Sequence, residues 1–216
     1  MVKLPKSDQL RVNMSDDAPQ LYLVTPPLQE ASNFKSRLVQ ALEAANLASL
    51  LIRFAHEDIR KNEEILRILT PLAQERNVAV LVENGVNEAL RCGADGAHIV
   101  GSTDDIATAV KKLSPRYIVG AGNLATRDDA MQAGELGVDY VHFVSSDAHQ
   151  LIERVAWWSE LFITPCVAKA ERLEEIALLA QAGADFIMLE DVVWSDPRHP
   201  AAALSDALAC LQGVSV

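Results

Sequence analysis

The pattern Gly-x-Asp occurs three times at nearly even spacing, and each copy leads into an apolar run of strand length. The copies begin at Gly93, Gly137 and Gly183, at intervals of 44 and 46 residues, and each follows an alanine-rich segment of helical character. A glycine just past a helix supplies the left-handed residue that ends it, and an aspartate two positions on bonds local backbone amides. Each copy therefore predicts a helix, a tight turn and a buried strand, with the aspartate as a turn former at the closed end of the fold.

Apolar runs alternate with longer amphipathic segments along the chain, which is typical of α/β folds. The strand candidates are residues 21–25, 48–53, 78–83, 96–100, 117–122, 140–145, 162–169 and 186–190. The helix candidates are residues 34–46, 62–76, 86–92, 104–113, 127–136, 149–160, 173–182 and 201–211. Eight such units predict a single (β/α)8 TIM barrel. The runner-up is a doubly wound open sheet, but Pro26 and Pro27 follow the first strand in place of a Gly-rich loop, which favours the barrel.

The domain boundaries follow from where the polar and apolar segments lie. Residues 1–20 are polar and carry no apolar segment of a secretion signal, so we expect a flexible N-terminal arm before a barrel over residues 21–216. The net charge of −11 argues against nucleic acid or an anionic membrane as a partner, and no apolar run approaches the roughly 18 residues of a membrane span. The three cysteines cannot all pair and lack metal-ligand spacing, which favours a reducing, cytoplasmic location.

A barrel collects the C-terminal ends of its strands at one mouth, so candidate functional residues are sought there. Glu83, Asp104 and Asp105 would bring carboxylates together from neighbouring strands. That arrangement suits Mg²⁺ when a substrate phosphate completes the coordination shell. The alternative is that Asp104 and Asp105 begin a helix, where acidic side chains complement the helix dipole.

Two basic residues also fall at the mouth. Lys169, at the end of the seventh strand, could bind a phosphate or, if desolvated, act as an amine nucleophile. The alternative is a structural ion pair with Glu190 or Asp191 on the neighbouring strand. Arg53, at the end of the second strand, could contact an anionic group or pair with Glu83.

Two histidines and two tryptophans have expected structural roles. His98 and His142 occupy matching positions in two of the repeats, and we expect buried imidazoles with satisfied hydrogen bonds. Trp157 and Trp158 lie in the sixth helix. One indole should pack on the barrel and the other should face a partner subunit, so the chain would permit a homo-oligomer.

Several segments together resemble the thiamine phosphate synthase family. They are Leu21–Thr25, Gly93–His98, Ile118–Ala121, the spaced small residues from Ala130 to Val141, and Gly183–Asp185. The resemblance implies a (β/α)8 barrel that joins hydroxymethylpyrimidine diphosphate to thiazole phosphate and releases pyrophosphate with magnesium. It also implies a dissociative reaction, in which a pyrimidine carbocation forms as pyrophosphate leaves and the thiazole nitrogen captures it. Small phosphorylated heterocycles are the substrates it implies.

The residues at the mouth differ from the family's pattern, which indicates a divergent member with degenerate active-site motifs. Of the family's Q-L-R-E-K segment this chain keeps the arginine as Arg53, and Asn84 stands where the family has a metal-binding aspartate. Arg53 and Lys169 are the candidate catalytic residues, and Glu83 and Asp104 are the candidate magnesium ligands. The candidate substrate-binding residues are Asn84, Asn123, Ser145, Ser146, Glu190 and Asp191.

Three functions stay open at this point. The first is an active, divergent thiamine phosphate synthase, which would be a transferase. The second is a catalytically silent or repurposed relative of the same fold that binds another small ligand. The third is a lyase that forms a Schiff base at Lys169 with Glu190 as proton carrier. The lineage favours a thiamine phosphate synthase-like barrel.

Overall fold

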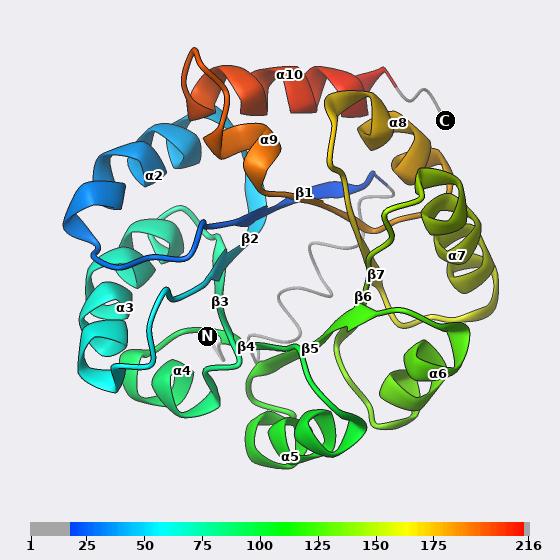
Figure 1. The fold of residues 1–216 in the computed structure, drawn as a ribbon, viewed down its shortest axis with the longest axis horizontal. Coiled ribbons are helices and arrows are strands. Elements are labelled where there is room, and N and C mark those ends of the chain that lie inside the picture. The colour runs from blue at the N-terminus through cyan, green and yellow to red at the C-terminus, as the bar shows by residue number, and fades with distance from the viewer. Residues whose placement is uncertain (1–17, 214–216) are drawn as a thin grey trace, which may run out of the picture.

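Eight parallel strands form a closed ring in the order of the sequence, with helices around the outside (Figure 1). The computed structural model describes residues 18–213. The strands are β1 (Gln20–Val24), β2 (Leu47–Ile52), β3 (Ala79–Glu83), β4 (Gly96–Ile99), β5 (Ile118–Leu124), β6 (Tyr140–Phe143), β7 (Cys166–Lys169) and β8 (Phe186–Leu189). Strand β1 pairs with both β2 and β8, which closes the ring. The barrel prediction is confirmed, and the open doubly wound sheet is wrong.

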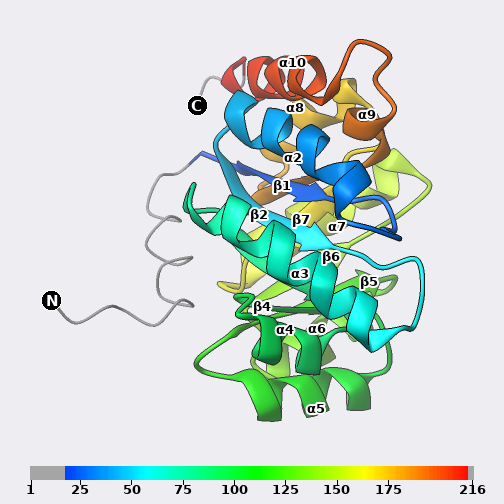
Figure 2. The ribbon, with the colours of Figure 1, turned by 90° about the vertical axis from the view of Figure 1, so that its left-hand side faces the viewer.

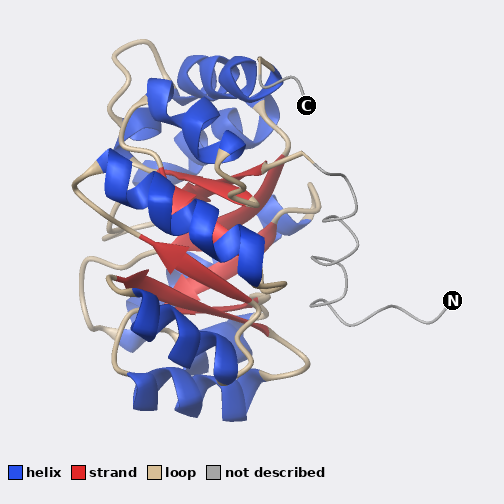
Figure 3. Ribbon diagram, turned by 90° about the vertical axis from the view of Figure 1, so that its right-hand side faces the viewer, coloured by secondary structure: helices blue, strands red, loops and turns tan. Residues whose placement is uncertain are grey.

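The helices lie in a layer outside the strands, as the two side views show (Figure 2, Figure 3). They are α2 (Ser32–Ala44), α3 (Ile59–Gln74), α4 (Val86–Cys92), α5 (Thr103–Leu113), α6 (Arg127–Glu135), α7 (Ala148–Leu161), α8 (Leu173–Gln181), α9 (Asp191–Trp194) and α10 (Pro200–Gln212). All the expected helices form, and α9 is a short addition after β8 that the sequence analysis missed. Within residues 18–213, no helix has the length and apolar character needed to cross a membrane.

The boundaries of the first and seventh strands differ from the prediction, by one residue at β1 and by four at β7. Strand β1 begins at Gln20, inside the segment expected to be an arm, and residues 1–17 of that segment lie outside the described residues. Strand β7 begins at Cys166, not at Phe162 as predicted. Phe162 instead caps α7, where its ring stacks on Trp158 with centroids 4.0 Å apart. The Trp158 indole nitrogen donates to the carbonyl of Thr164 at 2.6 Å, which fixes the turn into the strand.

Each Gly-x-Asp repeat ends a helix and ties two strands together. The glycines have the predicted left-handed conformation, with φ of 73° at Gly93, 81° at Gly137 and 95° at Gly183. The aspartates act over a longer range than predicted, because each side chain accepts a hydrogen bond from a backbone amide near the start of the preceding strand. The pairs, each at 2.8 Å, are Asp95 with Val80, Asp139 with Val119, and Asp185 with Cys166. The repeat therefore fastens β3 to β4, β5 to β6 and β7 to β8 at the closed end of the barrel.

Apolar side chains fill two regions, one inside the ring of strands and one between the strands and the helices. The interior cluster consists of Tyr22, Val24, Leu51, Leu81, Ile118, Tyr140, Val167, Phe186 and Met188. The larger outer cluster includes Leu38, Ile65 and Trp158. Successive side chains of a strand point to opposite faces, and both faces of this sheet are covered. That is why the strands read as continuous apolar runs in the sequence.

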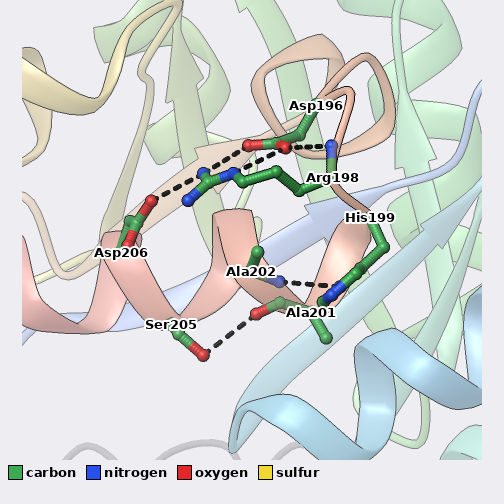
Figure 4. A network of polar contacts seen from close by, with 7 residues as sticks. All are labelled: Asp196, Arg198, His199, Ala201, Ala202, Ser205 and Asp206. Atoms are coloured by element: carbon green, nitrogen blue, oxygen red, sulfur yellow. Dashed lines mark hydrogen bonds and ion pairs between the residues drawn. The ribbon is translucent and has the colours of Figure 1, made fainter.

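The turn between α9 and α10 is fixed by a network of charged and polar contacts (Figure 4). Arg198 donates to both carboxylate oxygens of Asp196, at 3.0 and 2.6 Å, and to Asp206 on α10 at 2.8 Å. The Nδ1 atom of His199 accepts a hydrogen bond from the amide of Ala202 and caps α10. Helix α10 then packs between α2 and α8 (Figure 1).

Candidate functional site

Three charged side chains from different strands meet at the C-terminal end of the barrel, and we call Arg53, Lys169 and Glu190 the Glu190 cluster. A terminal guanidinium nitrogen of Arg53, which follows β2, donates to Oε1 of Glu190, which follows β8. The Nζ atom of Lys169, the last residue of β7, lies 2.9 Å from Oε2 of Glu190. The side chain of Arg53 is 20% exposed, that of Lys169 is 22% exposed and that of Glu190 is 13% exposed. The cluster is therefore only partly accessible to water.

Thr25, the residue after β1, holds Arg53 in place through two hydrogen bonds. Its backbone amide donates to Oγ1 of Thr25 at 3.1 Å, and its Nε donates to the carbonyl of Thr25 at 3.0 Å. Thr25 is fully buried, so it offers a fixed support. Of the two roles expected for Arg53, pairing with Glu83 is wrong in this structure, because the partner is Glu190.

Lys169 has the ion pair with Glu190 that the sequence analysis weighed as a structural alternative, and a second with Oε1 of Glu171 at 3.0 Å. Burial acts to lower the pKa of Lys169, but hydrogen bonds and charge attraction from Glu190 and Glu171 outweigh it and raise the pKa. The ammonium form is therefore favoured. A raised pKa suits a cation that binds an anionic group and works against an amine nucleophile.

Glu83 ends β3 beside the cluster and is half-buried. Burial raises the pKa of its carboxyl, the charge of Arg53 lowers it, and the charge of Glu190 raises it, with a net increase. Within the described part of the chain, its carboxylate makes no hydrogen bond or ion pair. The mouth thus holds a carboxylate that is free to take a cation.

The two aspartates after β4 have different environments. Asp105 forms a capping box with Ser102 at the start of α5, with the serine hydroxyl donating to its carboxylate at 2.6 Å. The helix-start interpretation therefore holds for both aspartates, since both lie in the first turn of α5. Asp104 lies exposed in the same first turn, and its carboxylate bonds to no described residue. Across residues 18–213, no group of three or more His, Cys, Asp or Glu side chains is arranged to hold a metal ion.

Asn84 and Asn123 share a left-handed backbone, with φ of 51° and 56°. The side-chain oxygen of Asn84 accepts a hydrogen bond from the amide of Val100 at 2.8 Å, so it joins the ends of β3 and β4. Asn123 is exposed and lies where the pairing of β5 with β6 shifts register. Asparagine tolerates this conformation better than most residues, which explains its use at both positions.

The remaining candidates lie around the mouth without joining the cluster. Ser145 accepts a hydrogen bond from the amide of Asp147 at 3.1 Å, and Ser146 follows it in the loop before α7. Asp191 is exposed at the start of α9. In the described chain, no hydrogen bond or ion pair connects Asp104, Asn123, Ser146 or Asp191 to the Glu190 cluster.

A chain of buried polar side chains crosses the barrel interior. The Tyr22 and Tyr140 hydroxyls lie 2.9 Å apart, and the Tyr140 hydroxyl lies 2.7 Å from Nδ1 of His98. Burial lowers the pKa of His98 to about 3, and burial raises the pKa of both tyrosines. All three side chains are therefore neutral at physiological pH. Neither tyrosine was among the predicted site residues, although alternation along β1 places Tyr22 on the same face as Val24.

His142 is buried beside His98, with ring centroids 5.3 Å apart. Both of its ring nitrogens are buried and have no hydrogen-bond partner in the described residues. Burial first, and then the proximity of His98 and Lys169, lowers its pKa well below the ordinary value. The expectation of a satisfied imidazole thus holds for Nδ1 of His98 and is wrong for His142.

Comparison with protein families finds one match over most of the chain. Residues 21–192 match the family described as Thiamine monophosphate synthase. Two relatives bear the name Thiamine-phosphate synthase. The one from Rhodospirillum centenum is 35% identical over 209 residues, which is 89% of this chain and 98% of the relative. The one from Hyphomonas neptunium is 34% identical over 85% of this chain and 90% of the relative.

A solved structure supports the fold. The thiamine phosphate pyrophosphorylase from Pyrococcus furiosus superposes with a TM-score of 0.77 and 21% sequence identity. The match covers 93% of this chain and 98% of that structure. The same ring of strands and helices thus occurs in both proteins.

Proposed function

The chain belongs to the thiamine monophosphate synthase family, and we propose that it joins hydroxymethylpyrimidine diphosphate to thiazole phosphate and releases pyrophosphate. The observation that carries the proposal is the position of Arg53. It is the arginine retained from the family's pattern, and Thr25 fixes its guanidinium at the mouth of the barrel. Both substrates are phosphorylated heterocycles, so a fixed guanidinium at the mouth can bind their phosphate oxygens.

The proposed chemistry places the reaction's changing charge next to Arg53 and Lys169. As the bond between the pyrimidine methylene and the diphosphate breaks, negative charge grows on the leaving pyrophosphate. Once the diphosphate has bound, two cations held beside it stabilise that charge as it forms, and they contribute more in a partly dry site than in water. The pyrimidine cation left behind is then captured by the thiazole nitrogen. No protein group has to transfer a proton in this step.

Magnesium fits this site only if the protein and the substrate phosphates both supply its ligands. Glu83 and Asp104 are candidate ligands because neither carboxylate bonds to another described residue, yet together they supply too few groups for a site built from protein alone. Magnesium in proteins commonly uses one or two carboxylates and completes its shell with substrate phosphate oxygens and water. Bound in this way, it would neutralise pyrophosphate charge. We propose Glu83 and Asp104 as its protein ligands.

Polar side chains around the mouth are proposed to contact the rest of the substrates. The exposed amide of Asn123 and the free side-chain nitrogen of Asn84 offer donors to ring nitrogens. Ser145 and Ser146 offer hydroxyls from the loop after β6. Glu190 and Asp191 bring carboxylates that would contact donor groups such as an exocyclic amine.

Two properties of the whole chain are also proposed. Cys92, Cys166 and Cys210 are free thiols, which supports a reducing, cytoplasmic location. Trp158 packs on the barrel as predicted, while Trp157 is half-buried with the Arg127 guanidinium 4.7 Å above its ring. This outer face of α7 is proposed to contact a second copy of the chain, and size measurement in solution tests it.

A coupling assay with the two phosphorylated precursors and magnesium tests the proposed reaction. Arg53→Met should lower the rate by about 100-fold or more, because it removes charge stabilisation at the leaving group. Arg60→Met is the control, since Arg60 is exposed on α3 and its side chain forms no ion pair with a described residue. No product from a folded wild-type chain would contradict the proposal and leave a repurposed relative of the fold.

A second candidate function has one observation in its favour. Glu190 pairs with both basic side chains of the mouth, which is the place where the sequence predicts altered family motifs. A divergent, catalytically silent chain that binds another small ligand would have such a mouth. The Schiff-base lyase is less well supported, because the pKa of Lys169 is raised. Borohydride trapping of a carbonyl compound on Lys169 would revive it.

A further inference from the structure

The carboxylate of Glu190 is saturated by cations from two other strands. Its Oε1 atom accepts from Arg53 and its Oε2 atom lies 2.9 Å from Nζ of Lys169. An anionic ligand would use the same two donors in the same way, with one oxygen on each. Glu190 therefore stands where a phosphate oxygen pair would be expected.

The charges around this position do not favour an additional anion. Two cations face three carboxylates, since Glu171 also pairs with Lys169 and Glu83 adds its charge when ionised. The Glu190 side chain is the least exposed member of its cluster, at 13%. Removing either cation from a half-buried carboxylate is costly unless a new partner replaces it. A phosphate group can thus bind in only two ways. Either the Glu190 carboxylate moves off the two cations, or the phosphate binds close to that carboxylate and is repelled by its charge.

We propose that Glu190 is a built-in competitor of anionic ligands, which occupies Arg53 and Lys169 and sets how tightly the mouth binds a diphosphate. Phosphate-bearing ligands displace its carboxylate from the two cations as they bind. The proposal rests on the proposed function only in placing the anion site at the mouth. It makes Glu190 a specificity-determining residue, because a ligand with more phosphate charge competes better for the cations.

Titration calorimetry of the full chain with sodium pyrophosphate tests the competition directly. Glu190→Gln keeps the shape of the side chain and removes its charge, so Arg53 loses its carboxylate partner and Lys169 keeps only Glu171. Pyrophosphate should bind this variant about tenfold or more tightly than the wild type. Adding Lys169→Met to Glu190→Gln should remove most of that gain.

Glu63→Gln is the matched control. Glu63 on α3 also bridges two cations, Arg67 at 2.7 Å and Arg91 at 3.1 Å, and its side chain is 14% exposed. The substitution changes the net charge equally, but on an outer helix and not at the end of a strand. It should leave pyrophosphate affinity unchanged within about twofold. Equal gains in both variants would mean a general charge effect and would overturn the proposal.

The outcomes separate this inference from the proposed reaction. An unchanged or weaker affinity in folded Glu190→Gln overturns the competitor role, even if the wild type performs the coupling reaction. A tighter affinity supports the role, even if no coupling product forms. Thermal unfolding with and without pyrophosphate checks that the variant is folded. Glu190→Ser serves the same test if glutamine cannot be accommodated.

Discussion

The carboxylate of Asp95 accepts a hydrogen bond from the backbone amide of Val80 at 2.8 Å, and the amide of Asp95 donates to the carbonyl of Val80 at 2.7 Å. Asp95, just before β4, thus makes both hydrogen bonds to Val80 of β3. Asp139 and Asp185 repeat this two-bond contact on later strands. The repeat in the sequence is therefore a repeated fastening of neighbouring strands.

Asp95→Ala should lower the free energy of unfolding by about 1–3 kcal/mol, because it leaves the buried amide of Val80 without its acceptor. Urea denaturation measures the loss. Asp128→Ala is the control, since Asp128 is an exposed aspartate in the first turn of α6. It should cost less than about 1 kcal/mol. Equal losses of unfolding free energy in the two variants would show that the hydrogen bond to Val80 adds no stability beyond that of an exposed aspartate.

Gly120→Ala should destabilise the barrel by about 1–3 kcal/mol through overpacking. A Cβ atom at Gly120 would run into the ring of Tyr140, which is buried inside the barrel. Gly213→Ala at the end of α10 is the comparison, because a Cβ atom there meets only ordinary contacts at 3.6 and 3.7 Å. Thermal unfolding of the two variants checks the prediction. A Gly120→Ala protein as stable as wild type would mean that the interior has unfilled space.

Stability should fall as the pH is lowered from about 6.5, because burial lowers the pKa of His98 to about 3. The unfolded chain binds a proton on this residue throughout that window and the folded chain does not, so protons favour unfolding. His98 alone contributes a slope of up to about 1.4 kcal/mol per pH unit. His142 acts in the same direction, since burial lowers its pKa as well.

Urea denaturation between pH 7.5 and pH 5 measures this slope. His98→Asn should reduce the slope, whatever its effect on stability at neutral pH. The prediction is contradicted if the His98→Asn variant keeps the wild-type slope.

Arg53→Lys should weaken pyrophosphate or substrate binding by about tenfold, although it keeps the charge. The guanidinium binds the carbonyl of Thr25 through Nε and Glu190 through a terminal nitrogen, and a single ammonium cannot reproduce this fork. Calorimetry of binding measures the change. Binding equal to wild type would show that Arg53 acts as a simple positive charge.

The chain order was enough to predict much of this molecule. Alternating apolar runs set the number of strands, and a parallel barrel brings the ends of consecutive strands together. Lys169 and Glu190 therefore had to be neighbours at the mouth, and their ion pair was foreseen as an alternative. The left-handed glycines were likewise predictable, because a helix ending before a strand needs such a residue.

Contacts across the ring could not be predicted in the same way. Arg53 reaches Glu190 past β1, and Tyr22 meets Tyr140 across the interior although 118 residues separate them. Such pairs depend on the length of the side chains and on the curvature of the closed sheet. Neither property produces a local pattern in the sequence. The two unpartnered nitrogens of His142 have no sequence signal at all.

Strand β1 is the only described strand that joins the last strand of the chain to the early ones, because it pairs with both β2 and β8. A chain shortened past Val24 would lose no catalytic candidate, yet it would expose the unpaired edges of β2 and β8 on an apolar sheet. Open edges of this kind template association with other chains. The short first strand thus protects the protein from aggregation as well as completing its fold.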